Sequence, residues 1–103
     1  MIIVLATIEL NPGTRDAFLD EFRKNLPAVR AEQGCIEYFP AVDHGTGLPS
    51  QAATRDDVVM VIEKWESTAA LEAHLIAPHM ITYRNQVKDY VKRASLQILE
   101  PAE

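Results

Sequence analysis

The residues best suited to chemistry lie in one short segment, positions 65–80, which holds the single tryptophan and two of the three histidines. At helical spacing, His74 falls on the same face as Leu71 and Leu75. A histidine on an apolar face can accept and release a proton near neutral pH. The alternative is a core histidine that is satisfied by one hydrogen bond. The segment therefore supplies a candidate proton acceptor.

A stripe of polar and aromatic side chains follows the proline at position 78. Its members at helical spacing are His79, Tyr83, Gln86 and Tyr90, beside a more apolar row of Met80, Val87 and Val91. Such a stripe could line a pocket for a flat ring. It could equally be half-buried packing whose hydroxyl groups reach solvent.

A metal site is not expected in this sequence. His74 and His79 are five residues apart with Pro78 between them, whereas two ligands on one helical face are three or four apart. Cys35 is the only cysteine, and nothing near it in sequence would lower the pKa of its thiol, so we expect a buried, inert side chain. The four glycines form no phosphate-binding loop.

Length and charge limit the class of protein. The chain has 103 residues, of which 48% are hydrophobic, and this predicts one domain over residues 1–103. Fifteen acidic and ten basic residues give a net charge of −5, which argues against nucleic acid as a partner. The apolar run 2–6 is too short to span a membrane, so a cytoplasmic protein is expected. The basic residues Arg84, Lys88, Lys92 and Arg93 are expected on a solvent-facing side of a helix, where they could guide an anionic substrate.

The first half of the chain predicts a strand, a helix and a second strand. Residues 2–10 are rich in β-branched residues, and the turn 11–13 ends them. A helix is predicted from Thr14, with a kink or a restarted turn at Pro27 and an exit at Gly34. A strand follows over 35–42. The polar residues 44–51 then predict a long, mobile hairpin connection, and the sequence leaves open whether residues 44–56 cover a pocket.

The second half repeats this order. Residues 57–66 form a third strand, and Ser67 is a suitable N-cap for a helix over 68–77. A second helical piece is predicted from Pro78 to about Arg93, before a fourth strand over 95–99. The order β-α-β-β-α-β predicts an α+β, ferredoxin-like fold, with both helices on one face of a four-stranded antiparallel sheet. Because the strands are apolar on both faces, we expect the other face to pack against a second copy in a homodimer.

Three groups of residues resemble the antibiotic biosynthesis monooxygenase (ABM) family. They are Gly34-Cys35-x-x-Tyr38, then Glu63-x-Trp65-Glu66-Ser67-x-x-x-Leu71-x-x-His74, and then Pro78-His79. The resemblance extends from Ile2 to Pro101, and within the family it is nearest to the bacterial quinol monooxygenases. The Trp–Leu–His segment is more specific for the fold than for the reaction.

The resemblance implies a dimeric α/β barrel-type assembly that oxidises a naphthoquinol-like quinol with dioxygen, without metal, haem or flavin. A deprotonated quinol is a strong electron donor, so the protein need only bind the ring, remove a proton and exclude bulk water. His74 is the predicted proton acceptor. The residues predicted to shape the substrate pocket are Trp65, His79, Tyr83 and Tyr38.

Other activities of the same fold bear on this prediction. Haem-degrading relatives use an Asn on the first strand, where this sequence has Ala6 and Thr7, so haem cleavage is not expected. Autoinducer-processing isomerases are similar around the His and Pro-His pair, which leaves a non-oxidative reaction on a small metabolite open. A non-catalytic, dimeric ligand-binding module is the third alternative, because fold alone does not define chemistry.

Overall fold

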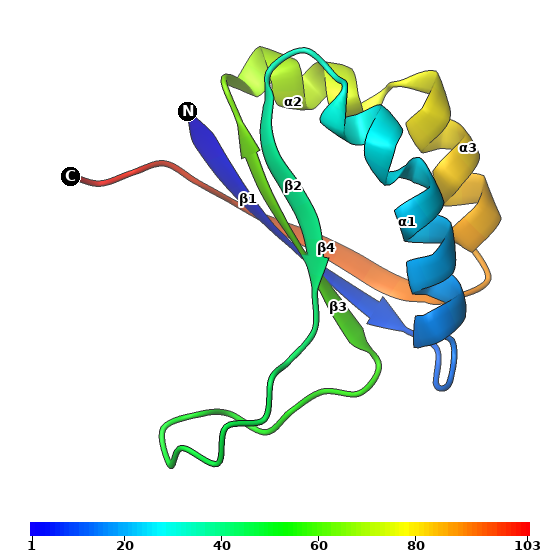
Figure 1. Ribbon diagram of the computed structural model, residues 1–103, viewed down its shortest axis with the longest axis vertical. Helices are drawn as coiled ribbons and strands as arrows, with labels where there is room; N and C mark the ends of the chain where they lie inside the picture. The colour runs from blue at the N-terminus through cyan, green and yellow to red at the C-terminus, as the bar shows by residue number, and fades with distance from the viewer.

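The computed structural model describes all residues, 1–103, and contains one four-stranded antiparallel sheet with helices on one face (Figure 1). The sheet has the order β2-β3-β1-β4. The elements in chain order are β1 (Ile2–Leu10), α1 (Arg15–Arg30), β2 (Cys35–Ala41), β3 (Val58–Trp65), α2 (Thr68–Leu75), α3 (Pro78–Val87) and β4 (Val91–Leu99). The predicted ferredoxin-like arrangement is confirmed, with its second helical region divided into α2 and α3.

The core lies between the sheet and the helices. Side chains of β1 and β3 alternate between the two faces, and Val4, Ala6, Val59 and Val61 point toward the helices. From α1, the side chains of Phe18, Leu19, Phe22 and Val29 are buried against them. No helix is both long enough and apolar enough to cross a membrane.

Two local predictions about helices differ from the structure. Helix α1 continues through Pro27 to Arg30 without a restarted turn. Pro27 and Arg23 are both exposed, so solvent can satisfy the Arg23 carbonyl that receives no hydrogen bond from the proline. Gly34, with φ +86°, lies beyond the α1 C-cap at Ala31 and forms the turn into β2 instead. The predicted cap of α2 is confirmed, because Ser67 Oγ accepts a hydrogen bond from the Ala70 amide at 3.1 Å.

The boundary between α3 and β4 was predicted wrongly. Helix α3 ends at Val87 rather than near Arg93, and β4 begins at Val91 rather than at residue 95. The amide of Asn11 donates to the Tyr90 carbonyl at 2.8 Å, and β4 pairs with β1 from Val91 onward. Pairing along nearly all of β1 therefore overrides the helical tendency of the charged residues 88–93.

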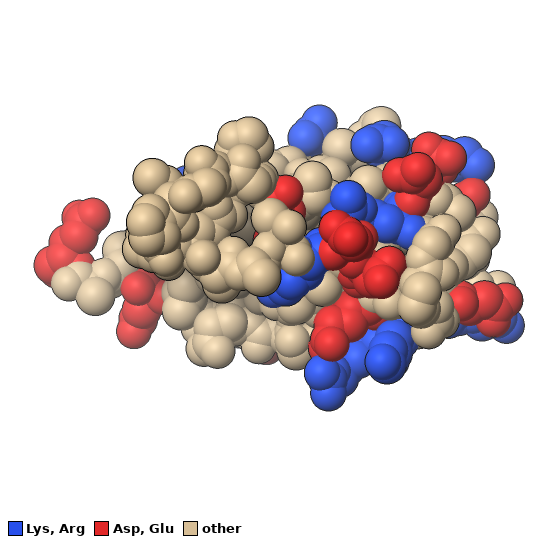
Figure 2. Space-filling model, turned by 90° about the horizontal axis from the view of Figure 1, so that it is seen from below, with Lys and Arg blue, Asp and Glu red and all other residues tan.

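The charged side chains are mixed in sign over part of the surface. Viewed from below, Lys and Arg side chains lie among Asp and Glu side chains on one half of the molecule, whereas the other half shows almost no basic side chains and carries acidic ones mainly at its far end (Figure 2). Residues 42–57 connect β2 to β3 and extend away from the helices (Figure 1). A salt bridge between Arg55 and Asp43, at 2.8 Å, holds the base of this connection.

Candidate active site

An apolar cavity of about 470 Å³ lies between the sheet and the helices. Thirteen of its 17 lining residues are hydrophobic. The sheet contributes Ala6, Ile8, Tyr38, Val61, Glu63, Val91, Ala94 and Leu96; the helical side contributes Phe18, Phe22, His74, Leu75, Met80, Tyr83, Arg84, Val87 and Lys88. Among these residues, Leu75, Arg84, Lys88, Ala94 and Leu96 are exposed, so the cavity opens between α2–α3 and the edge strand β4. Its size is typical of a small-molecule site.

His74, on α2, is a buried residue of the cavity wall. Its side chain is 2% exposed, and its Nδ1 is 2.8 Å from Glu32 Oε2. Because an ionised carboxyl group only accepts hydrogen bonds, this contact places the proton of the neutral ring on Nδ1. Nε2 then carries the lone pair and has no partner within the chain. The arrangement suits a proton acceptor for a molecule in the cavity.

Aromatic rings surround the imidazole. The ring centre of Trp65 lies 4.7 Å from that of His74, and the ring centre of Tyr38 lies 5.4 Å away. Burial lowers the pKa of His74, and the hydrogen bond to Glu32 opposes that shift. The net effect favours the neutral imidazole, which is the form that can take a proton.

Glu63 is a cavity residue that the sequence analysis did not select as a site residue. It is 5% exposed, on the inner face of β3 between Val61 and Trp65. Trp65 Nε1 donates a hydrogen bond to Glu63 Oε1 at 2.9 Å. Burial raises the pKa of Glu63 to about 7, although the indole hydrogen bond acts in the opposite direction. The alternation of β3 could have identified it, because Glu63 is the only charged residue in that inner row.

Glu32 was also missed, and it joins the two histidines. It lies in the turn between α1 and β2, and its Oε2 is 2.8 Å from His74 Nδ1 and 3.3 Å from His79 Nε2. The second contact falls outside hydrogen-bond geometry, since His79 Nε2 is buried without a hydrogen-bond partner. His79 Nδ1 is 3.1 Å from Asn25 Oδ1 on α1. No local sequence signal marks Glu32, because 42 residues separate it from His74.

The structure brings three of the five predicted site residues to the cavity wall: His74, Tyr38 and Tyr83. Trp65 is fully buried beside His74 and does not line the cavity. His79 lies in a separate polar hollow, together with Lys24, Asn25, Thr82 and Gln86. Burial raises the pKa of both Tyr38 and Tyr83 above the ordinary range of a phenol, so both hydroxyl groups stay protonated.

The predicted stripe on α3 divides between these two regions. Tyr83 joins Met80 and Val87 in the cavity wall, whereas His79 and Gln86 face the polar hollow. The expectation that all four stripe residues share one surface is therefore wrong. One face of α3, which includes Tyr83, lines the cavity, whereas the face with His79 lies beside α1, where His79 Nδ1 is 3.1 Å from Asn25 Oδ1.

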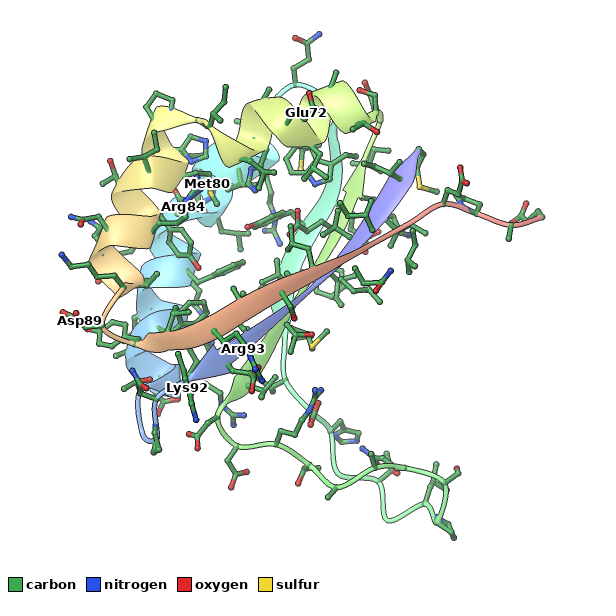
Figure 3. The ribbon with its side chains drawn as sticks, turned by 180° about the vertical axis from the view of Figure 1, so that it is seen from behind. Glu72, Met80, Arg84, Asp89, Lys92 and Arg93 are labelled. Atoms are coloured by element: carbon green, nitrogen blue, oxygen red, sulfur yellow. The ribbon has the colours of Figure 1, made fainter.

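The basic residues also divide between two elements. Arg84 and Lys88 lie at the cavity mouth, whereas Lys92 and Arg93 belong to β4 (Figure 3). The Arg84 guanidinium donates to the Leu75 carbonyl, and Arg93 pairs with Glu9 at 2.5 Å. The predicted single helical face is thus wrong, since the chain leaves the helix at Val87.

Two further predictions concern residues outside the cavity. None of residues 42–57 lines the cavity, so the connection between β2 and β3 does not cover it. Cys35 is half-buried at the start of β2, and burial raises the pKa of its thiol. A raised pKa disfavours the reactive thiolate, in agreement with an inert side chain.

Comparisons with known proteins agree with the fold and with the family resemblance. The "Probable quinol monooxygenase YgiN" of Escherichia coli strain K12 is 46% identical over 98% of both chains. The crystal structure of PA3566 from Pseudomonas aeruginosa matches with a TM-score of 0.80 at 24% identity, over 99% of this chain and 94% of the other. The structure of Rv0793 from Mycobacterium tuberculosis matches with a TM-score of 0.75 at 24% identity, over 99% and 95%. The family model described as "Antibiotic biosynthesis monooxygenase" matches residues 1–86, and the chain therefore belongs to the antibiotic biosynthesis monooxygenase family.

Proposed function

We propose that this protein is a cofactor-independent enzyme that oxidises a naphthoquinol-like quinol to the quinone with dioxygen. Membership of the monooxygenase family supports a reaction with dioxygen, although the proposed step transfers no oxygen atom to the ring. The name of the E. coli relative supports a quinol as the substrate. The observation that carries the proposal is the position of His74. Its ring is buried at the wall of an apolar cavity, with Nδ1 held by Glu32 and Nε2 unpaired.

The proposed reaction begins with proton transfer from one quinol hydroxyl to His74 Nε2. The resulting anion gives up electrons far more readily than the neutral quinol. Two electrons pass from the ring to dioxygen and both O–H protons leave the quinol, so the products are quinone and hydrogen peroxide. The apolar walls favour this sequence because they exclude bulk water from the ring and from the reduced oxygen.

The remaining predicted residues have supporting roles in this proposal. Tyr38 and Tyr83 are placed to contact a flat ring, since both line the cavity with protonated hydroxyl groups. Trp65 packs behind His74 and fixes the imidazole plane. His79 has only an indirect role: it lies outside the cavity and approaches the Glu32 carboxylate that His74 also contacts, so its replacement is expected to change the rate little.

Oxygen uptake tests the proposal directly. Protein freed of metal and flavin, with its metal content measured, is mixed with a reduced naphthoquinol in air-saturated buffer. We expect uptake well above the spontaneous rate, with one quinone and one hydrogen peroxide formed per dioxygen consumed. Labelling with ¹⁸O₂ should place no label in the quinone, and label in the ring would instead indicate hydroxylation with water as the second product. Uptake at the spontaneous rate would refute quinol oxidation.

We also infer that the working unit is a homodimer. The outer face of the sheet carries half-exposed apolar side chains at its centre, namely Ile3, Leu5, Phe39, Met60 and Ile62, and no helix covers this face (Figure 1). An apolar face of this kind is typical of a protein interface. Light scattering after size-exclusion chromatography should give the dimer mass, and Ile62→Lys should give the monomer mass. A monomeric wild-type protein would contradict the inference.

A further inference from the structure

Besides the two tyrosines Tyr38 and Tyr83, two ionisable side chains lie buried at the cavity wall, and the proposed reaction uses one of them, His74. The other is Glu63, whose side chain is 5% exposed and lies among apolar residues of β1 and β3. Carboxyl groups are seldom buried to this extent without a cation as partner, because the ionised form loses its hydration. Glu63 forms no salt bridge, so its position calls for a reason other than ion pairing.

The two carboxyl oxygens of Glu63 have different surroundings. Oε1 accepts the hydrogen bond from the Trp65 indole at 2.9 Å. Oε2 has no partner in the chain. Among side-chain nitrogen and oxygen atoms that are fully enclosed by protein, only His79 Nε2 lacks a hydrogen bond. Glu63 Oε2 also lacks a hydrogen bond, so it is not fully enclosed. Because Glu63 lines the cavity, we infer that Oε2 faces this open space.

Titratable and charged groups approach Glu63 from each neighbouring element. Tyr38 lies directly opposite it on β2, and His74 reaches the same wall from α2. Tyr83 and Arg84 line the cavity from α3. The negative charge of Glu32 acts on it from the turn after α1. Glu63 is thus part of the wall to which His74 belongs, with Trp65 touching both side chains.

A purely structural role does not account for a carboxyl group at this position. Orienting the Trp65 indole requires one acceptor oxygen, and the neutral amide of glutamine would supply it at a lower desolvation cost. A carboxyl group adds the ability to bind and release a proton. That ability is useful in a cavity where bulk water is excluded.

We propose that Glu63 is a second catalytic residue, whose Oε2 receives the quinol hydroxyl proton that His74 does not take. This inference rests on the proposed quinol oxidation. Each quinol breaks two O–H bonds and releases two protons; His74 Nε2 takes one and Glu63 Oε2 the other. Two electrons pass from the ring to dioxygen, and both residues return their protons to the reduced oxygen, which leaves as hydrogen peroxide. A pKa of about 7 suits a group that both accepts and returns a proton near neutral pH.

The test compares Glu63→Gln with Glu72→Gln, an exposed glutamate on the outer side of α2 (Figure 3). Quinone affinity, measured by titration, should stay within about 2-fold in both variants. In Glu63→Gln, kcat should fall by about 10- to 100-fold. The kcat of the wild type should rise with pH around pH 7, and this rise should be absent from Glu63→Gln. The kcat and the pH profile of Glu72→Gln should match those of the wild type. Glu63→Asp, which keeps a carboxyl group, should show part of the rise of kcat with pH that Glu63→Gln lacks.

A second readout does not depend on turnover. Trp65 is the only tryptophan, and its indole touches Glu63, so its fluorescence should change with a midpoint near pH 7. The transition should be absent from Glu63→Gln and should persist in His74→Gln, which removes the titrating imidazole beside the same indole. A wild-type kcat and pH profile in Glu63→Gln would overturn the proposal and leave Glu63 as an acceptor for Trp65. Failure of the wild type to oxidise quinol would instead refute the proposed function, while the fluorescence titration would remain.

Discussion

The apolar cavity and the polar hollow lie on opposite sides of one carboxylate. Glu32 Oε2 contacts His74, which lines the cavity, and His79, which lines the hollow. Thirteen of the cavity's lining residues are hydrophobic, whereas none of the five residues of the hollow is. His74 is 2% exposed, against 28% for the His79 side chain. The two regions therefore present the same residue type and the same partner in opposite surroundings.

This difference shows that burial, rather than the histidine–glutamate pair, defines the candidate catalytic group. Burial lowers the pKa of His74 and so keeps its imidazole neutral. The unpaired nitrogen, Nε2, belongs to a side chain that lines the apolar cavity. His79 contacts an amide oxygen and lies close to solvent-exposed side chains. Helical spacing placed His74 among leucines, but it did not show that His79, five residues later, lies outside the cavity.

The largest expected effect belongs to His74. His74→Gln removes the proton acceptor while keeping a polar side chain of similar length, and we expect kcat/KM for quinol oxidation to fall by about 100- to 1000-fold. Oxygen uptake measures the rate, and the free energy of unfolding from urea titration shows whether the fold is intact. Full activity in a folded variant would show that His74, in the cavity, is no more important for the reaction than His79, in the hollow.

A change in stability with pH is expected from Glu63. Its pKa is raised from 4.5 to about 7 in the folded protein, so the folded state binds this proton more tightly than the unfolded chain. The resulting stability is fully present below about pH 4.5 and is lost as the pH rises through about 7. Glu63→Gln has no carboxyl group at this position and so does not lose this stability. As the pH rises from about 4.5 to about 7, the free energy of unfolding of Glu63→Gln minus that of the wild type should therefore increase by roughly 1–3 kcal/mol.

Urea unfolding of both proteins at a series of pH values between 4.5 and 8 measures this difference. Glu72→Gln serves as the control and should follow the wild type throughout. A difference between Glu63→Gln and the wild type that does not vary with pH would mean that Glu63 titrates as an ordinary carboxyl group, and that the cavity does not desolvate it.

A smaller effect is expected from Glu32, which joins the two regions. Its hydrogen bond and its charge both raise the pKa of His74. Glu32→Gln keeps an acceptor oxygen for Nδ1 but removes the charge, so the pKa of His74 should fall further and kcat should drop by about 10-fold. Nuclear magnetic resonance titration of the His74 ring protons reports this shift. An unchanged His74 titration would show that Glu32 only positions the ring.

The smallest effect is expected from His79. His79→Gln changes the hollow but leaves the cavity wall intact, and kcat/KM should stay within about 2-fold of the wild-type value. Steady-state oxygen uptake, measured on His79→Gln and His74→Gln under the same conditions, compares the effects of the two substitutions. A loss approaching that of His74→Gln would show that the two histidines act as one unit through Glu32.

Much of the fold follows from sequence patterns, because each strand and helix carries its own periodicity. The strand 2–10, the Ser67 cap and the start of α3 at Pro78 were predicted at their observed positions. The end of α3 was not, since four of the six residues 88–93 are charged and the segment is compatible with a helix. Their conformation is decided by pairing with β1, a contact that spans some eighty residues of chain.

The site could be predicted only in part for the same reason. His74 was identified because helical spacing placed it among leucines. Glu32 reaches His74 from 42 residues away, and no local pattern records that contact. Glu63 stood in the family motif, but its place in the site depends on the cavity that six other elements help to enclose.

The connection over residues 42–57 has a practical consequence. It carries exposed side chains, among them Leu48 at 61% exposure, and no residue of the segment lines the cavity. A tether attached there should leave the mouth between α2–α3 and β4 unobstructed. The protein could then be fixed to an electrode through this segment, and the quinone expected from the proposed reaction could be measured as a current while the cavity stays open to the surrounding solution.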